Sequence, residues 1–324
     1  MTTSSLLRVS DLAVVYNIAG SRISAIDNVS LDVPSKGFTL GVVGESGSGK
    51  TTLGMSVMNL IERPGKIISG SIEFNGKDVL KMRKDELKQY RWRQVSMVYQ
   101  SAMNSLNPVK TITDPLVEVM QVHSNLNRGE ARERAVKLLG EVGIPDDRAG
   151  AYPHQLSGGM RQRVVIALAL ALSPKLLIAD EPTSALDVVV QKQILSLLKK
   201  EILEKNLSLI FITHEILLLG GLVENVAVMY AGEIVEQGPI SKVLKDPRHP
   251  YTEMLLGTLL TMDSQRTALE SQRANQNEPL DGLLSRAACK YAKRCKYAFT
   301  RCQEERPQLK ETDDGRLVAC HKYN

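Results

Sequence analysis

The chain has 324 residues, a formal net charge of +5, and hydrophobic and charged fractions of 43% and 24%, values that argue against a disordered or fibrous chain. Its longest purely apolar run, residues 164–172, is far shorter than the about 18 residues that a transmembrane helix needs. The N-terminus lacks the basic region and apolar core of a signal peptide. We therefore expect a soluble, intracellular chain that acts at a membrane only through a partner.

The excess positive charge lies at the C-terminal end. Residues 285–324 contain ten Lys and Arg against five Asp and Glu, and the rest of the chain is balanced. A balanced main body argues against a nucleic-acid-binding surface, because such surfaces are strongly basic. All four cysteines also lie in that tail. In an intracellular protein this favours metal binding over disulfide bonds.

Two strand-like segments come first, at residues 6–16 and 29–33. Tyr16 lies at the end of the first segment and has two interpretations. It could be an aromatic surface on which a nucleotide base stacks, or a half-buried tyrosine of the strand. The sequence leaves both open, and we keep Tyr16 as a nucleotide-binding candidate.

Residues 44–51 have the sequence Gly-Glu-Ser-Gly-Ser-Gly-Lys-Thr, which fits the phosphate-binding P-loop pattern. The apolar run 38–43 predicts a strand before it and residues 51–61 predict a helix after it, the context that separates the motif from a chance glycine-rich turn. Glycines let backbone N–H groups surround phosphate oxygens at a helix N-terminus. Lys50 is expected to reach the β- and γ-phosphates and Thr51 to bind Mg²⁺. The nucleotide-binding candidates here are Gly44, Glu45, Ser46, Gly47, Ser48, Gly49, Lys50, Thr51 and Thr52.

Two further strands are predicted between the P-loop and the middle of the chain. Residues 70–76 form one, ending in a hairpin-like turn, and residues 95–99 form the other. Gln100 follows the second strand directly. It could bind Mg²⁺ or orient a water molecule, or it could be an ordinary loop glutamine, and position alone does not decide.

Residues 114–123 and 129–142 have the apolar spacing of helices. In the second segment, the positions expected on one face are Ala131, Ala135, Leu138, Leu139 and Val142. We predict that this block is an inserted helical subdomain of about residues 101–173.

Ser157, Gly158 and Gly159 precede a predicted helix that ends near Leu172. Ser157 stands at its N-cap, where a hydroxyl and backbone N–H groups can hold an anion. An ordinary helix cap explains the same residues equally well.

Residues 176–181 are an apolar strand that ends in two carboxylates. Asp180 fits the acid that supports Mg²⁺ in P-loop enzymes, and Glu181 is then placed to polarise the water that attacks the γ-phosphate. The alternative is a solvated acidic turn, which the P-loop in the same chain disfavours.

The next segments are a helix at 188–205, a strand at 207–213, and strands at 226–230 and 233–237 that form a hairpin. His214 ends the first of these strands. A lone histidine is usually structural, but one in this position could bind a γ-phosphate.

The order of these motifs resembles that of the ABC-transporter ATPase family. The matching motifs are Walker A at 44–51, the Q-loop at Gln100, the signature at 156–163, Walker B at 180–181, the D-loop at 184–187 and the H-loop at His214. The resemblance covers roughly residues 6–260, and the combination is specific. Asp usually follows the H-loop histidine in the family, whereas Glu215 follows it here, which keeps the charge.

More narrowly, the chain is similar to the dipeptide and oligopeptide importer ATPases. The stretches that carry this similarity are 100–108, 152–155, 249–252, 255–256 and the cysteine tail with 318–321. Close relatives of that subfamily carry oligosaccharides or nickel, so the substrate stays open between these and peptides.

The resemblance implies an α/β P-loop NTPase fold with a RecA-like core, an antiparallel β subdomain and the helical subdomain. It assigns residues 1–260 to this ATPase domain and 285–324 to a small cysteine-rich domain. The segment between them, 261–284, is polar and rich in Gln, Ser, Asn and Glu, a composition that predicts a linker. The implied reaction is ATP hydrolysis. Glu181, His214 and Gln100 are then catalytic, Thr51, Gln100 and Asp180 hold Mg²⁺, and Ser157, Gly158, Gly159 and Asp187 join the nucleotide site.

In this family the Ser157 segment of one subunit closes over the ATP held by the Lys50 segment of another. The implied partners are a second ATPase subunit (a paralogue in preference to a copy), two transmembrane permease subunits and an extracytoplasmic substrate-binding protein, with no nucleic acid. The implied location is the cytoplasmic face of the cell membrane.

Two other classes are disfavoured. A non-transport ABC ATPase acting on nucleic acid or ribosomes would carry a long coiled coil or two cassettes, and this chain has neither sustained heptads nor a second Walker A motif. A regulatory, catalytically weak cassette would lack Glu181 or His214, and both are present.

The four cysteines of the tail are the remaining feature; they are Cys289, Cys295, Cys302 and Cys320. Structural zinc sites more often use closer pairs, whereas a [4Fe–4S] cluster holds its irons further apart and needs four thiolates. We expect the basic residues Lys290, Lys293, Arg294, Lys296 and Arg301 to favour thiolates.

The resembled importer ATPases carry such a cluster at cysteines in this arrangement. Pro commonly follows the first two cysteines in them, whereas Lys290 and Lys296 stand there in this chain. We predict a [4Fe–4S] cluster with a structural role. A redox-sensing role, a zinc site and free thiols are the alternatives.

Overall fold

The computed structural model describes residues 5–18, 20–100, 105–124, 126–184, 186–260 and 287–323. Three predictions fall wholly or partly outside the described residues: the linker at 261–284, residues 101–104 of the Q-loop extension, and Ala185 in the D-loop. In the part of the chain that is described, no helix is long and apolar enough to cross a membrane.

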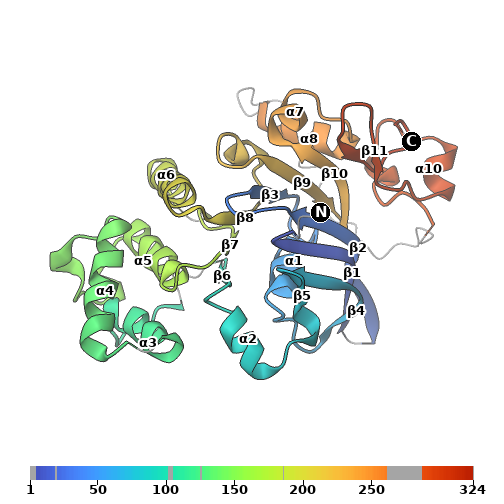
Figure 1. Ribbon diagram of the computed structural model, residues 1–324. Coiled ribbons are helices and arrows are strands. Elements are labelled where there is room, and N and C mark those ends of the chain that lie inside the picture. The colour runs from blue at the N-terminus through green and yellow to red at the C-terminus, as the bar shows by residue number, and fades with distance from the viewer. Residues whose placement is uncertain are drawn as a thin grey trace.

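An eight-stranded sheet forms the centre of the molecule (Figure 1). In spatial order its strands are β11 (Lys310–Glu311), β12 (Leu317–Val318), β10 (Glu233–Pro239), β9 (Asn225–Tyr230), β3 (Thr39–Val43), β8 (Ser208–Thr213), β7 (Leu176–Asp180) and β6 (Val95–Val98). The five strands from β9 to β6 run parallel. Their carboxyl ends therefore lie along one edge of the sheet, where open α/β sheets bind ligands.

A smaller antiparallel sheet lies beside the first (Figure 1). Its order is β2 (Ser21–Val33), β1 (Leu7–Ile18), β4 (Gly65–Phe74) and β5 (Lys77–Asp78). The predicted strand at 29–33 is only the end of β2, which begins at Ser21. Residues 21–24 are exposed and pair with the outer end of β1, so they lack the apolar alternation by which a strand is predicted.

The helices of the described residues are α1 (Lys50–Val57), α2 (Lys84–Tyr90), α3 (Thr113–His123), α4 (Arg128–Glu141), α5 (Gly158–Leu170), α6 (Val188–Lys205), α7 (Ile240–Lys245), α8 (Pro250–Leu260) and α10 (Thr300–Glu304). Short 3₁₀ turns lie at Val79–Lys81, Asp146–Arg148, Pro153–Gln155, Ile216–Leu219 and Ala292–Arg294. The helix predicted at 51–61 is wrong at its C-terminal end. The chain leaves helical geometry after Met58, because Asn59 adopts a left-handed conformation with φ 51.

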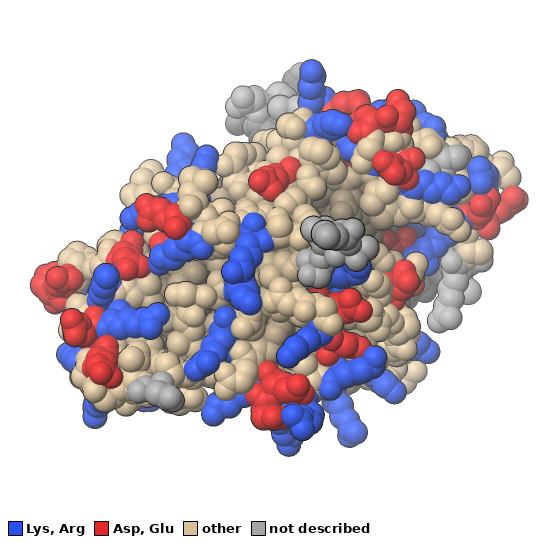
Figure 2. All heavy atoms as spheres, viewed as in Figure 1, with Lys and Arg blue, Asp and Glu red and all other residues tan. Residues whose placement is uncertain are grey.

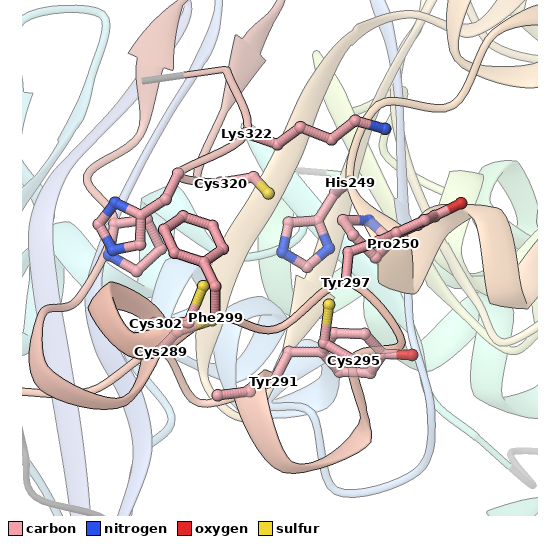
Figure 3. Close-up of a pocket in the computed structure, with 13 residues that line it drawn as sticks. His249, Pro250, Cys289, Tyr291, Cys295, Tyr297, Phe299, Cys302, Cys320 and Lys322 are labelled. Carbon is pink, nitrogen blue, oxygen red and sulfur yellow. The ribbon is translucent and has the colours of Figure 1, made fainter.

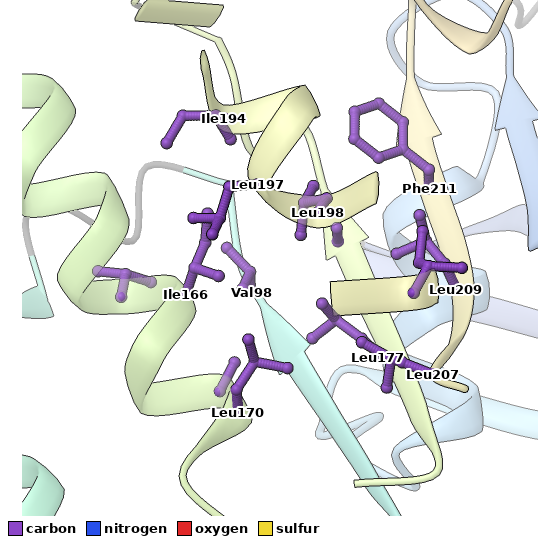
Figure 4. Packing of buried hydrophobic residues seen from close by; sticks show 14 of the residues in the cluster. Val98, Ile166, Leu170, Leu177, Ile194, Leu197, Leu198, Leu207, Leu209 and Phe211 are labelled. Carbon is purple, nitrogen blue, oxygen red and sulfur yellow. The ribbon is translucent and has the colours of Figure 1, made fainter. Parts of the chain in front are cut away.

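Two hydrophobic clusters cover the two faces of the large sheet. Along β8, Leu209 and Phe211 belong to one cluster while Ile210 and Ile212 belong to the other, as the two-residue period of a strand requires. The first cluster packs the sheet against α5 and α6 (Figure 4). The second packs it against α1 and the small sheet.

Helices α3, α4 and α5 form the block on the left of Figure 1, away from the small sheet. Within α4 and at its end, the positions predicted to share one face are all buried: Ala131, Ala135, Leu138, Leu139 and Val142. Helix α6 has the bounds predicted from sequence. It ends at Asn206, another left-handed asparagine, with φ 50.

The cysteine tail packs on the main body. Its strand β12 pairs with β10 and so extends the large sheet. Arg316 in the tail is 1% exposed and donates to Glu236 of β10, which is 0% exposed, at 3.2 Å. Lys290 and Arg306 both form ion pairs with Asp27 of β2. The division at 261–284 stays a prediction.

Candidate functional site

The P-loop connects β3 to α1, as its motif requires. Gly44 and Gly49 cannot carry side chains, because a Cβ would collide with the carbonyl oxygens of Met229 and Ala25 respectively. Gly49 also has φ 100 and is the N-cap residue of α1. The loop therefore packs closely against neighbouring backbone. The first turn of α1, which follows the loop, can then bind an anion with its backbone N–H groups.

Lys50 is 6% exposed and folds back over the loop. Its Nζ donates to the carbonyl oxygens of Gly44 at 2.7 Å and Glu45 at 2.9 Å. Burial lowers the pKa of Lys50, and the nearby carboxylates of Glu181, Asp180 and Glu45 oppose that change. A phosphate chain in the loop would give this buried ammonium group a charged partner.

Three of the predicted catalytic residues meet at the carboxyl edge of the sheet. Gln100 follows β6, Glu181 follows β7 and His214 follows β8. Gln100 Nε2 donates to Glu181 Oε2 at 3.0 Å, and His214 Nδ1 lies 3.1 Å from Glu181 Oε1. Glu181 has φ 45, an uncommon conformation for a residue other than glycine and one found often at functional sites. One carboxylate is therefore held from both sides.

Asp180 is the group best suited to a metal ion. Asp180 is 1% exposed, and among the described residues its carboxylate has no hydrogen-bond partner beyond the adjacent Thr51 hydroxyl. Burial raises the pKa of Asp180, Glu181 raises it further, and the adjacent Thr51 hydroxyl and Lys50 oppose the rise. An unpaired buried carboxylate beside a hydroxyl fits Mg²⁺, which takes oxygen ligands, so the predicted pair Thr51 and Asp180 is chemically suitable.

The Ser-Gly-Gly turn is not part of this group of residues. Ser157 is the N-cap of α5, and its Oγ accepts the Met160 N–H at 3.3 Å. Asp187 caps α6 by accepting the N–H groups of Val189 and Val190. Helix α5 packs on the helical block, α6 and β6, whereas α1 contacts β2 and β7. Helix α5 thus lies with the helical block, whereas α1 lies beside the small sheet (Figure 1).

Tyr16 is half-buried in β1 and pairs with Gly65 of β4. A Cβ at Gly65 would press on its ring, and the ring packs against the second hydrophobic cluster. These contacts suit the structural interpretation, and base stacking by Tyr16 stays a prediction.

Two contacts on the P-loop were not anticipated from the sequence. The Tyr251 hydroxyl accepts the backbone N–H of Glu45 at 2.7 Å. Arg294 of the tail donates to both carboxylate oxygens of Glu45, at 2.8 and 2.9 Å. Glu45 and Arg294 are 249 positions apart, and no local sequence pattern predicts a contact between them.

The four cysteines line one pocket together with His249 and Tyr291 (Figure 3). Three of the sulfur atoms accept a backbone N–H from the residue two positions further on, that is Tyr291 for Cys289, Tyr297 for Cys295 and Lys322 for Cys320. Among the described residues, no three Cys, His, Asp or Glu side chains are close enough to hold a single metal ion. The four thiol groups therefore surround the pocket, and they do not meet at the position of a single metal ion.

The expectation that neighbouring bases favour thiolates is wrong in its net effect: Lys296 lowers the pKa of Cys295, but burial outweighs it. Burial raises the pKa of Cys289 to about 11 and also raises that of Cys295 and Cys320. The basic side chains form ion pairs elsewhere: Lys290 with Asp27 and Glu233, Arg294 with Glu45, Lys296 with Glu253, and Arg301 with Glu305.

Two family models match the sequence. A model described as ABC transporter matches residues 26–184, and one described as the C-terminal region of oligopeptide/dipeptide transporters matches residues 235–302. The chain is 41% identical to the dipeptide transport ATP-binding protein DppD of Escherichia coli, covering 98% of this chain and 96% of that protein. It is also 41% identical to the oligopeptide transport ATP-binding protein AppD of Bacillus subtilis, covering 99% and 97%.

Two solved structures are also similar to this chain. A dimeric post-hydrolysis state of the ATP-binding cassette MJ0796 with ADP and phosphate matches with a TM-score of 0.63 at 29% identity, covering 72% of this chain and 98% of that one. CbiO1 of Clostridium perfringens, part of the transporter complex cbiONQ, matches with a TM-score of 0.64 at 26% identity, covering 83% and 99%.

Proposed function

Because this chain belongs to the ABC transporter ATPases, we propose that it is the ATP-hydrolysing subunit of an importer of dipeptides or oligopeptides. Membership confirms the predicted α/β P-loop NTPase fold and the predicted ATPase activity. The observation that carries the site assignment is the convergence of Lys50, Asp180 and the Gln100–Glu181–His214 group at one edge of the sheet.

The chemistry follows from these positions. The P-loop N–H groups and Lys50 hold the phosphates, and Mg²⁺ beside Thr51 and Asp180 would offset their negative charge. Glu181 then accepts a proton from the attacking water. Gln100 and the Nδ1–H tautomer of His214 donate to the two oxygens of Glu181 and fix the direction of its carboxylate.

The catalytic unit is proposed to be a dimer with two shared sites. The Ser157 turn begins α5, on the helical side of the chain, and lies apart from the P-loop of its own chain. A second subunit, a paralogue in preference to a copy, would supply that turn to the nucleotide. Two transmembrane permeases and an extracytoplasmic substrate-binding protein complete the proposed complex at the cytoplasmic face of the membrane.

We also propose that Cys289, Cys295, Cys302 and Cys320 hold a [4Fe–4S] cluster. All four thiols line one pocket, and backbone N–H groups point at three of the sulfurs, as is usual around cluster thiolates. A cluster needs its ligands spread around a cube, which the separation of the thiols suits better than one zinc ion. Burial raises the pKa of Cys289, Cys295 and Cys320, so the bound iron would have to stabilise their thiolates.

The peptide assignment is tested with the assembled transporter. The complex is purified through this subunit, its components are identified by mass spectrometry, and ATP turnover is measured in lipid vesicles with the substrate-binding protein. A stimulation by dipeptides or oligopeptides supports the proposal, and a complex carrying Glu181→Gln is the control for contaminating ATPases. Stimulation by nickel or by oligosaccharides, and not by peptides, would contradict it.

A nucleic-acid role has little support. Lys and Arg alternate with Asp and Glu over the face shown in Figure 2, with no extended basic field. Nucleic-acid-binding surfaces concentrate positive charge on one face or stripe.

A further inference from the structure

The P-loop is fixed from outside by the cysteine tail. Glu45, the second residue of the loop, has its carboxylate held by both terminal nitrogens of Arg294. The two side chains are 36% and 33% exposed, so the pair is half-buried. Bidentate pairing of a guanidinium group with a carboxylate is strong and fixes orientation as well as distance.

Arg294 is itself held in place by aromatic rings. Its guanidinium group lies 5.8 Å from the ring centres of Tyr230 and Tyr291. Tyr251 packs against both rings, at centroid distances of 4.7 and 5.5 Å, and its hydroxyl accepts the Glu45 N–H. The backbone and the side chain of Glu45 are therefore both positioned by groups outside the P-loop.

The same contacts reach Lys50. Its Nζ donates to the Glu45 carbonyl at 2.9 Å, and the Glu45 carboxylate is one of the charges that favour the protonated amine. If Arg294 were absent, this carboxylate would be free to turn toward Lys50. There it would compete with the phosphates of ATP and repel them.

We propose that Arg294 is a positioning residue for nucleotide binding, which draws the Glu45 carboxylate away from Lys50 and neutralises it. The inference rests on the P-loop being the ATP site. It also gives the tail a role beyond its own fold, because Tyr291 lines the cysteine pocket and contacts Arg294.

The test measures the ATP dissociation constant by calorimetry on the full-length chain carrying Glu181→Gln, in which hydrolysis is slow. Arg294→Ala is expected to raise Kd about three- to tenfold, and Arg294→Lys to recover part of the loss, since the charge returns without the two-pronged contact. The double variant Arg294→Ala/Glu45→Gln should bind ATP with a Kd within about twofold of that of Glu45→Gln alone, because the carboxylate that Arg294 neutralises is absent from both. The matched control is Arg301→Ala, which removes a tail arginine paired with Glu305 and should leave Kd unchanged.

A purely structural role for Arg294 predicts a different pattern. In that case Arg294→Ala lowers the thermal midpoint and the fraction of binding-competent protein, and Glu45→Gln does not restore Kd. That result, or an unchanged Kd in Arg294→Ala, overturns the proposal. In wild-type background the proposal predicts a raised KM for ATP with kcat little changed. Tight ATP binding by Lys50→Ala would instead show that the P-loop assignment itself is wrong.

Discussion

His214 Nδ1 lies 3.1 Å from Oε1 of Glu181, although the two residues are 33 positions apart and end different strands. Strands β7 and β8 are parallel neighbours, so their carboxyl ends place the imidazole beside the carboxylate. Gln100, at the end of β6, holds the other oxygen. The carboxylate of Glu181, the proposed general base, thus has a fixed direction in the absence of nucleotide.

Glu181→Gln is expected to bind ATP normally and to hydrolyse it about 10²–10⁴-fold more slowly, because an amide cannot accept the proton of the attacking water. Steady-state turnover and equilibrium ATP binding are measured on the same preparation. Hydrolysis near the wild-type rate would show that another group acts as the base.

Lys50→Ala is expected to abolish measurable ATP binding, since it removes the buried ammonium group that is proposed to bind the phosphates. Calorimetry against the Glu181→Gln variant gives the comparison, because that substitution lies in the same site and should spare binding. Micromolar binding by Lys50→Ala would contradict the phosphate role.

The shared site predicts an asymmetry between two mixed dimers. With Lys50→Ala on this chain and the serine that corresponds to Ser157 changed to Ala on the second subunit, whether copy or paralogue, one composite site stays intact and ATP hydrolysis persists. With both substitutions on the same subunit, each site has one defect and hydrolysis is largely lost. The dimers are purified by two affinity tags, and the reverse order of activities would place Ser157 in its own chain's site.

Anaerobic purification should give a brown protein with about four irons per chain if the cysteines hold a [4Fe–4S] cluster. Cys302→Ser should lose the colour and most of the iron, while Arg301→Ala, next to it but paired outward with Glu305, should keep both. A colourless wild-type protein with one zinc ion would exclude the cluster.

Arg316→Met is expected to destabilise the fold by about 3 kcal/mol, because it leaves the buried carboxylate of Glu236 without its charged partner, with the backbone N–H groups of Arg248 and His249 still donating to it. Arg301→Ala, which removes a solvent-exposed pair, should change the stability little, because water screens such pairs. Burial raises the pKa of Glu236, and losing Arg316 raises it further. The loss in free energy of unfolding caused by Arg316→Met should therefore become smaller as the pH falls and Glu236 becomes protonated. Chemical denaturation at two pH values measures this, and an equal penalty at both would argue against an ionised Glu236.

Much of the ATP-site assignment could be made from sequence because its signals are local. The P-loop, the paired acids 180–181 and the apolar, fully buried strands that precede them are contiguous stretches of the sequence. Helix α6 was predicted at its observed bounds for the same reason. Where the local signal was absent the prediction failed, as at the exposed start of β2 and at Asn59, whose left-handed conformation ends α1 early.

The sequence by itself determined which residues can do the chemistry, because the glycines, the lysine and the carboxylates of the site each follow a recognisable strand or turn. Only the tertiary structure decided which of them touch. The parallel order of β6, β7 and β8 brings Gln100, Glu181 and His214 together. Because the tail packs on the sheet, Arg294 contacts Glu45. The same packing pairs the basic residues near the cysteines, such as Lys290 and Lys296, with carboxylates of the main body. Contacts between distant segments depend on sheet order and packing, and no local period encodes them.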